Sequence, residues 1–159
     1  MGPLTERLKG HTLVALDTNC LVYYLEDHPW AGDLQEAVFL PLEQGRLRAV
    51  ISVLAIAELL VRPKALGLQD VCEEYVALLC SYPNLEVAPM TLEIAIRCAE
   101  IRASHRVRTP DAIALATACQ RGASLFLTND ADLPRAVDGT EVVLLSDLLP
   151  SPDLLPSPK

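Results

Sequence analysis

The sequence predicts an α/β fold in which a parallel sheet of about five strands lies between two layers of helices. Short apolar runs alternate with longer segments whose apolar residues recur at helical spacing. This alternation is typical of parallel sheets, because each connection between parallel strands must cross the sheet and usually does so as a helix. With 159 residues and 51% hydrophobic content, the chain is long and apolar enough for one domain with a substantial core.

Five apolar runs are the expected strands. The first is followed by the polar segment Asp17–Thr18–Asn19, and the third is stopped by Pro89. The expected strands cover residues 13–16, 47–51, 85–87, 124–127 and 141–145.

Six helices are expected between these strands, and several have a start signal. Asp17 or Thr18 caps the first helix, and Ser52 caps the third. Thr109–Pro110–Asp111 has the pattern of a helix start, with proline in the first turn. The expected helices cover residues 18–26, 33–44, 52–61, 68–80, 91–105 and 109–118.

The C-terminal residues are expected to lie outside the domain. The sequence Leu-Leu-Pro-Ser-Pro at residues 148–152 is repeated at 154–158. Frequent prolines prevent helices and sheet ladders, because proline has no backbone N–H to donate. We therefore expect a single domain over residues 1–147 and an extended tail over 148–159, which serves as a linker or as a docking segment.

The amino-acid composition limits the classes of function that this protein can have. The net charge of 13 − 21 = −8 argues against a broad basic surface for nucleic acid, although bound divalent cations would offset part of it. Aromatic residues make up 4% of the chain, which leaves few rings for stacking bases. Five cysteines without a C-x-x-C pair indicate reduced thiols in a cytoplasmic protein. No signal core or membrane-spanning run is expected, since no apolar run approaches ~20 residues.

Four acidic residues lie where an apolar run meets a turn or a helix. Asp17 and Asp130 follow expected strands, Glu58 interrupts an apolar run, and Asp111 lies in a first helical turn. In parallel α/β sheets, sites form beyond the carboxyl ends of the strands, so these residues can meet there. Two like charges ~4 Å apart repel by about 4 kcal/mol at an effective dielectric near 20, so such a cluster needs protons or a divalent cation.

Each acidic residue also has a purely structural interpretation. Asp17 can cap a helix, Asp111 can stabilise a helix dipole, and Asp130 can belong to a turn. Glu58 is the hardest to explain in this way, because a lone carboxylate among apolar neighbours is costly to bury. The four residues in their order are more informative than any one of them.

In these motifs the chain resembles the PIN-domain nucleases, in particular the toxin ribonucleases of bacterial and archaeal toxin–antitoxin pairs. The resemblance implies a three-layer α/β/α PIN-like fold and the hydrolysis of RNA. It also implies that the catalytic residues Asp17, Glu58, Asp111 and Asp130 hold Mg²⁺, for which Mn²⁺ can substitute. The matching pieces span residues 13 to about 133 and are Leu16–Asp17–Thr18–Asn19, Ser52 with Glu58, Thr109–Pro110–Asp111 and Leu127–Thr128–Asn129–Asp130.

The resemblance further implies polar residues that support the acidic ones. Asn19 and Thr128 fit such positions, whereas Ser52 either orients a ligand or only caps its helix. The fourth acid is Asp130 or Asp132. We favour Asp130 because it lies closer to the expected strand, which leaves Asp132 a supporting role.

RNA, a small antitoxin protein and a second copy of the chain are the expected partners. Arg102, Arg106 and Arg108 form a basic run that leads into Asp111 and is the candidate RNA-binding segment. The alternative is that this run is only the solvated face of a helix. Surplus apolar residues on helices 33–42 and 68–80 suggest a homodimer interface, but burial in the core explains them equally well.

Two other functions that use an acid at the end of a strand fit these motifs poorly. A phosphatase of the haloacid dehalogenase type needs a second acid at position 19, where this chain has Asn19. A receiver domain needs a lysine after a late strand, and none is present there. Three alternatives within the family remain: a toxin, a nuclease of RNA maturation or decay, and an inert module that binds RNA or protein.

Overall fold

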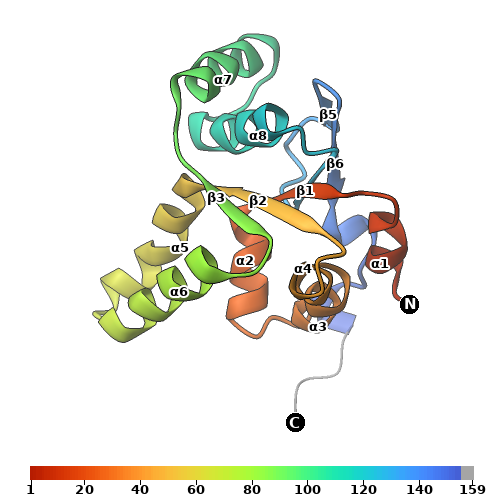
Figure 1. Cartoon of the computed structure of the whole chain (residues 1–159), viewed down its shortest axis with the longest axis vertical. Coiled ribbons are helices and arrows are strands. Elements are labelled where there is room, and N and C mark those ends of the chain that lie inside the picture. Colours follow the sequence, from red (N-terminus) through yellow and green to blue (C-terminus); the bar gives the residue numbers. More distant parts are fainter. Residues whose placement is uncertain (155–159) are drawn as a thin grey trace.

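The computed structural model describes residues 1–154 and has three layers (Figure 1). A six-stranded sheet of order β3-β2-β1-β4-β6-β5 forms the middle layer. Two helices, α7 and α8, cover one face of the sheet, and the remaining long helices cover the other. The expected α/β class is therefore confirmed. Within the described residues, no helix has both the length and the apolar character needed to cross a bilayer.

The strands lie close to the five expected runs, with one short strand in addition. Neighbouring strands pair in parallel except β5, which is antiparallel to β6. The additional strand, β5, has only two residues, too few for a periodic pattern, and Asp138 and Gly139 at its end both have positive φ, as in a tight hairpin turn. The strands are β1 Leu13–Leu16, β2 Arg48–Ser52, β3 Leu85–Ala88, β4 Leu125–Thr128, β5 Ala136–Val137 and β6 Thr140–Leu144.

The expected helices are all present, with shifted ends and one addition. The addition is α1, which buries Leu4 and Leu8 one turn apart against the core. The α-helices are α1 Pro3–Leu8, α2 Thr18–Leu25, α3 Ala31–Leu34, α4 Leu40–Glu43, α5 Val53–Ala65, α6 Gln69–Ser81, α7 Leu92–Ser104 and α8 Thr109–Arg121. Short 3₁₀ turns follow at Leu145–Asp147 and Pro152–Leu154.

One expected helix, at residues 33–44, has an irregular middle. A π-helical segment, Gln35–Phe39, separates α3 from α4, and the N–H of Leu40 donates to the carbonyl of Gln35 five residues earlier. Pro41 accounts for the irregularity, because it has no N–H to continue the ordinary ladder.

A second difference concerns the end of α5. Residues Arg62–Pro63 were expected to end this helix after Val61, but it continues through Pro63 to Ala65. Pro63 is buried with Leu59 on the inner face of the helix, and this packing outweighs the local preference of the residue before proline for extended backbone.

The core has two halves, one on each face of the sheet. Val14 and Leu16 of β1 point into the half formed by α2, α5 and α6, whereas Ala15 points toward α7 and α8. All three are at most 2% exposed. Because β1 is covered on both faces, the chain leaves the core at the carboxyl end of β1, and Asp17 lies there.

The packed part of the chain continues beyond the expected domain boundary at residue 147. Leu149 is 4% exposed, and the indole Nε1 of Trp30 donates to the carbonyl of Pro150 at 2.8 Å. The segment from Pro152 to Leu154 is a 3₁₀ turn rather than extended. The rest of the expected tail, residues 155–159, lies outside the described residues.

This packing predicts that the C-terminal segment stabilises the fold. Leu149→Ala should lower the free energy of unfolding by about 2–5 kcal/mol, because it leaves a cavity in the core. The melting temperature should fall by roughly 2–4 °C per kcal/mol. Leu154→Ala is the control, since Leu154 is 80% exposed. Equal melting temperatures for the two variants would contradict the packing.

Candidate active site

The site begins where β1 and β4 end side by side. Leu16 of β1 pairs with Leu127 of β4, and the next N–H, that of Asp17, donates to the carbonyl of Leu127 at 2.9 Å. This register places Asp17 beside Thr128. The hydroxyl of Thr128 donates to Oδ2 of Asp17 at 2.7 Å.

Asp17 is held on both carboxylate oxygens. Its Oδ1 accepts from the N–H of Thr18 at 2.8 Å, so Asp17, not Thr18, is the N-cap of α2. The amide of Asn19 donates to Oδ2 at 3.4 Å and lies 3.3 Å from the hydroxyl of Thr128. Asn19 and Thr128 therefore both contact Asp17.

Glu58 reaches the site from α5. The hydroxyl of Thr18 donates to its Oε1 at 3.2 Å. A lone carboxylate at this position is costly to bury unless it faces a polar pocket. Glu58 is an exposed residue whose carboxylate lies toward the other acids, while Ala55 and Leu59 of the same helix are buried in the core. Ser52 is 7% exposed and its hydroxyl accepts from the N–H of Leu54, which makes it the N-cap of α5.

Asp111 reaches the site from the first turn of α8. The N-cap of this helix is Arg108, one residue earlier than the expected Thr109. The Nε of Arg108 lies 3.2 Å from Oδ2 of Asp111, and the Arg108 side chain is 81% exposed. Arg108 thus supplies positive charge at the edge of the acidic group.

The loop after β4 presents Asp130 rather than Asp132 to the site. The N–H of Asp130 donates to the hydroxyl of Thr128 at 3.1 Å, and Oδ1 of Asp130 accepts from the N–H of Asp132 at 3.0 Å. The charge of Asp130 also acts on Asp17. Asp132 is exposed, and in the described part of the chain only its backbone contacts this group.

The raised pKa values of Asp17 and Glu58 indicate that the four carboxylates lie in one region. Burial raises the pKa of Asp17, and the charges of Asp111 and Asp130 raise it further, against the hydrogen bonds from Thr128 and Thr18. Partial burial likewise raises the pKa of Glu58, and so do the charges of Asp17 and Asp111. Each of the four acids, which come from distant parts of the sequence, is therefore close enough to at least one other for their charges to repel.

This donor set fits a hard divalent cation, although it is not pre-assembled around one. Carboxylate oxygens are the ligands that Mg²⁺ and Mn²⁺ prefer, and mutual repulsion favours a positive ion between them. Among residues 1–154, no three Asp, Glu, His or Cys side chains lie close enough together to surround an ion. A shared ion would therefore require the carboxylate side chains to rotate toward it.

The three arginines of the expected RNA-binding segment differ in their surroundings. Arg108 contacts the acidic group directly. The Nε of Arg102 donates to the carbonyl of Val107 at 3.1 Å and so braces the turn before α8, and Arg106 is exposed.

Several supporting contacts were not anticipated from the sequence. The hydroxyl of Thr18 bonds to Glu58, and the side chain of Asn129 joins the hydroxyl of Tyr23 to the N–H of Ser146. The thiol of Cys20 donates to the carbonyl of Leu127 at 3.2 Å. These contacts join segments that are far apart in sequence, so no local pattern predicts them.

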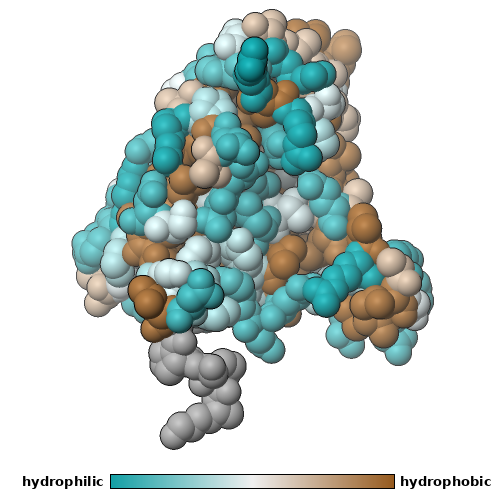
Figure 2. Space-filling model, turned by 180° about the vertical axis from the view of Figure 1, so that it is seen from behind, coloured by the Kyte–Doolittle hydropathy of each residue, from teal (hydrophilic) through white to brown (hydrophobic). Residues whose placement is uncertain are grey.

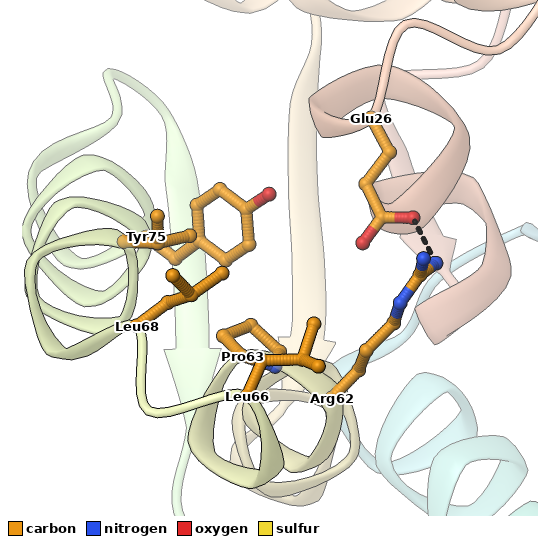
Figure 3. Close-up of a pocket in the computed structure, with 7 residues that line it drawn as sticks. Glu26, Arg62, Pro63, Leu66, Leu68 and Tyr75 are labelled. Atoms are coloured by element: carbon orange, nitrogen blue, oxygen red, sulfur yellow. Dashed lines mark ion pairs between the residues drawn. The ribbon is translucent and has the colours of Figure 1, made fainter.

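A separate pocket of about 380 Å³ lies between α2, α5 and α6 (Figure 3). Glu26 and Arg62 form an ion pair at its rim, and the Tyr75 ring forms one wall. None of the four acidic residues lines this pocket. Apolar surface is exposed at this end of α5 and α6 (Figure 2). Leu66 and Leu68, which line the pocket, and Val61 are all exposed there.

Comparison with known families decides the classification. The family model of the PIN domain matches residues 14–139. The chain belongs to the PIN-domain family. The matched segment contains all four acidic residues, and the resemblance drawn from their motifs is confirmed. No curated protein matches this PIN domain in sequence.

Three solved structures are similar in fold to this PIN domain. A toxin–antitoxin complex from Klebsiella pneumoniae has a TM-score of 0.61 at 23% identity, covering 80% of this chain and 94% of that one. VapBC2 from Rickettsia felis, bound to a promoter DNA fragment, has a TM-score of 0.64 at 18% identity and covers 84% and 98%. DNA-bound VapBC from Salmonella typhimurium has a TM-score of 0.59 at 22% identity and covers 83% and 97%. At these identities the similarity establishes the fold.

The raised pKa of Asp17 predicts a pH-dependent stability difference. Between 3.8 and the raised pKa, the folded state binds more protons than the unfolded state, so stability falls as the pH rises through this window. Asp17→Asn removes the charge and keeps an N-cap acceptor. Without metal, the variant should be more stable at pH 7 because it carries no buried, repelled charge at this position. Each kcal/mol gained in the free energy of unfolding should raise the melting temperature by roughly 2–4 °C.

The same gain should vanish below pH 3.8, where Asp17 is protonated in both states. Thermal melts of wild type and variant across this pH range measure it. Asp132→Asn is the matched control, because this exposed acid lies nearby but outside the group. A constant difference at every pH would show that charge is not the cause.

Proposed function

We propose that this PIN domain is a Mg²⁺-dependent endoribonuclease and the toxin of a toxin–antitoxin pair. The observation that carries the proposal is the meeting of Asp17, Glu58, Asp111 and Asp130 at one edge of the sheet, where the charges of three of them raise the pKa of Asp17 or Glu58. A chain that retains four mutually repelling carboxylates without a cation would lose stability for no gain.

Each residue has a proposed task in the hydrolysis of a phosphodiester. Asp17 and Asp111 would hold the ion directly, while Glu58 and Asp130 would share it or orient a water molecule. When bound, Mg²⁺ or Mn²⁺ would supply Lewis acidity toward a phosphate oxygen and make a water molecule more acidic. Because water is the attacking group, the products should carry 5′-phosphate and 3′-hydroxyl ends.

The arginines before α8 would bind the RNA backbone. Arg108 is best placed, because it already lies at the acidic group and its exposed side chain can turn toward a phosphate. Arg106 is exposed beside it, and Arg102 would act mainly by holding the turn in shape. With few aromatic residues, we infer that RNA shape matters more than base sequence.

Two accompanying proposals concern partners. A second copy of the chain would bind through exposed apolar residues of segment 68–80. The apolar residues of segment 33–42, which also suggested an interface, are mostly buried in the core. One of the similar structures is a toxin–antitoxin complex, which supports a toxin over a nuclease of RNA maturation. The retained carboxylates argue against an inert RNA-binding or protein-binding module.

Cleavage of structured RNA tests the proposed reaction. Wild type should cleave in the presence of Mg²⁺ or Mn²⁺, and EDTA should abolish cleavage. Asp17→Asn and Asp111→Asn should each reduce the rate by at least about 100-fold, since each removes a proposed metal ligand. Activity that survives EDTA, or persists in both variants, would rule out this mechanism.

The antitoxin proposal has its own test. The gene should lie beside a short reading frame whose product has a DNA-binding N-terminus. When the two proteins are expressed together, they should purify as a stoichiometric complex, and RNA cleavage should fall at least about tenfold relative to the isolated chain. Unchanged cleavage in a verified complex would favour RNA maturation or decay instead.

A further inference from the structure

Thr18 contacts two of the four carboxylates. Its backbone N–H donates to Oδ1 of Asp17 at 2.8 Å, and its hydroxyl donates to Oε1 of Glu58 at 3.2 Å. Asp17 lies at the end of β1, whereas Glu58 lies in the middle of α5. A single residue at the start of α2 therefore links acids that are 41 positions apart in the sequence.

Glu58 depends on such a link. Its side chain is exposed, and a glutamate has three rotatable bonds whose freedom must be restricted to fix the carboxylate. The charges of Asp17 and Asp111 repel it, and the charge of Arg108 attracts it less strongly. Among the described residues, the hydroxyl of Thr18 is its only hydrogen-bond donor. Without this bond, repulsion would direct Glu58 toward solvent.

We propose that Thr18 is a positioning residue that sets the affinity of the site for its metal ion. Its hydroxyl fixes Glu58 through Oε1 and leaves Oε2 available, while its N–H fixes the orientation of Asp17. Thr18 itself touches neither substrate nor reacting atoms. This inference rests on the metal-dependent function proposed above, and it identifies what holds Glu58 in place.

A second link between the same helices allows the role to be isolated. Arg62 of α5 and Glu26 at the end of α2 form an ion pair of 3.7 Å at the rim of the pocket (Figure 3). This pair joins α2 to α5, as Thr18 does, but it contacts none of the four acids. If Thr18 merely fastened the two helices together, loss of the Arg62 pair would have a similar effect.

The experiment compares Mn²⁺ binding by four full-length variants with that of wild type. Thr18→Val removes the hydroxyl and keeps the shape, Thr18→Ser keeps the hydroxyl, Arg62→Gln breaks the second link, and Asp17→Asn removes a ligand. Calorimetry should show Mn²⁺ affinity about tenfold weaker in Thr18→Val, which is typical of losing a residue that orients a ligand. Thr18→Ser should stay within about threefold of wild type, and Arg62→Gln should be unchanged.

The metal-free protein gives a second readout. A crystal structure of Thr18→Val without metal should show the Glu58 carboxylate turned away from the position it has in wild type. Its melting temperature without metal should match that of wild type within about 2 °C, which excludes a general folding defect. With saturating Mn²⁺, the rise in melting temperature should be smaller for Thr18→Val than for Thr18→Ser.

Several results would overturn the inference. Wild-type affinity in Thr18→Val, an equal loss in Thr18→Ser, or an equal loss in Arg62→Gln would each show that the hydroxyl does not position Glu58. An unmoved Glu58 in the metal-free crystal would show the same. If wild type and Asp17→Asn both fail to bind Mn²⁺ and to cleave RNA, the proposed function itself fails, and this inference fails with it.

Discussion

The acidic site depends on the parallel pairing of β1 with β4. Their register sets Leu16 opposite Leu127, and the hydrogen bond from the hydroxyl of Thr128 to Asp17 follows from it. A slip of one residue would turn every side chain of β1 to the other face of the sheet. Because both strands are buried on both faces, such a slip would exchange Ala15 with the larger Val14 and Leu16 between the two halves of the core, and this mispacking fixes the register.

The acids near the carboxyl ends of β1 and β4 repel one another electrostatically, and hydrogen bonds hold Asp17 among them in place. Burial and like charges act against the ionised form of Asp17, whereas Thr128, Thr18 and Asn19 all donate to it. Arg108 offsets part of the charge on Asp111. Such repulsion is common at cation sites, because the ion relieves it on binding. A site without repulsion in the absence of the ion would gain less free energy from binding it.

Much of the framework could be predicted from local sequence patterns. Apolar runs located the long strands, and capping chemistry located the starts of α2 and α5, since both signals lie within a few residues. The smaller features were missed for physical reasons. The hairpin strand β5 is too short for a periodic pattern, and the π-helical turn before Pro41 is one irregular turn inside a segment whose apolar spacing is helical.

The site was predictable in its residues but not in its contacts. Asp17 and Asp130 could be placed because each follows a strand, and the sheet brings such positions together. The exposure of Glu58 could not be foreseen, because it depends on the rotation of α5 about its axis after packing. The same holds for the bond between Thr18 and Glu58, which joins two helices.

The two-residue strand β5 affects how the molecule behaves in concentrated solution. Open sheet edges attract strands of other molecules, and natural proteins discourage this by making edge strands very short. Here β5 turns back at Asp138–Gly139 and covers part of β6, and Arg97 forms an ion pair with Asp138 beside it. This edge offers a neighbouring chain little unpaired backbone, so the sheet is protected there against edge-to-edge aggregation.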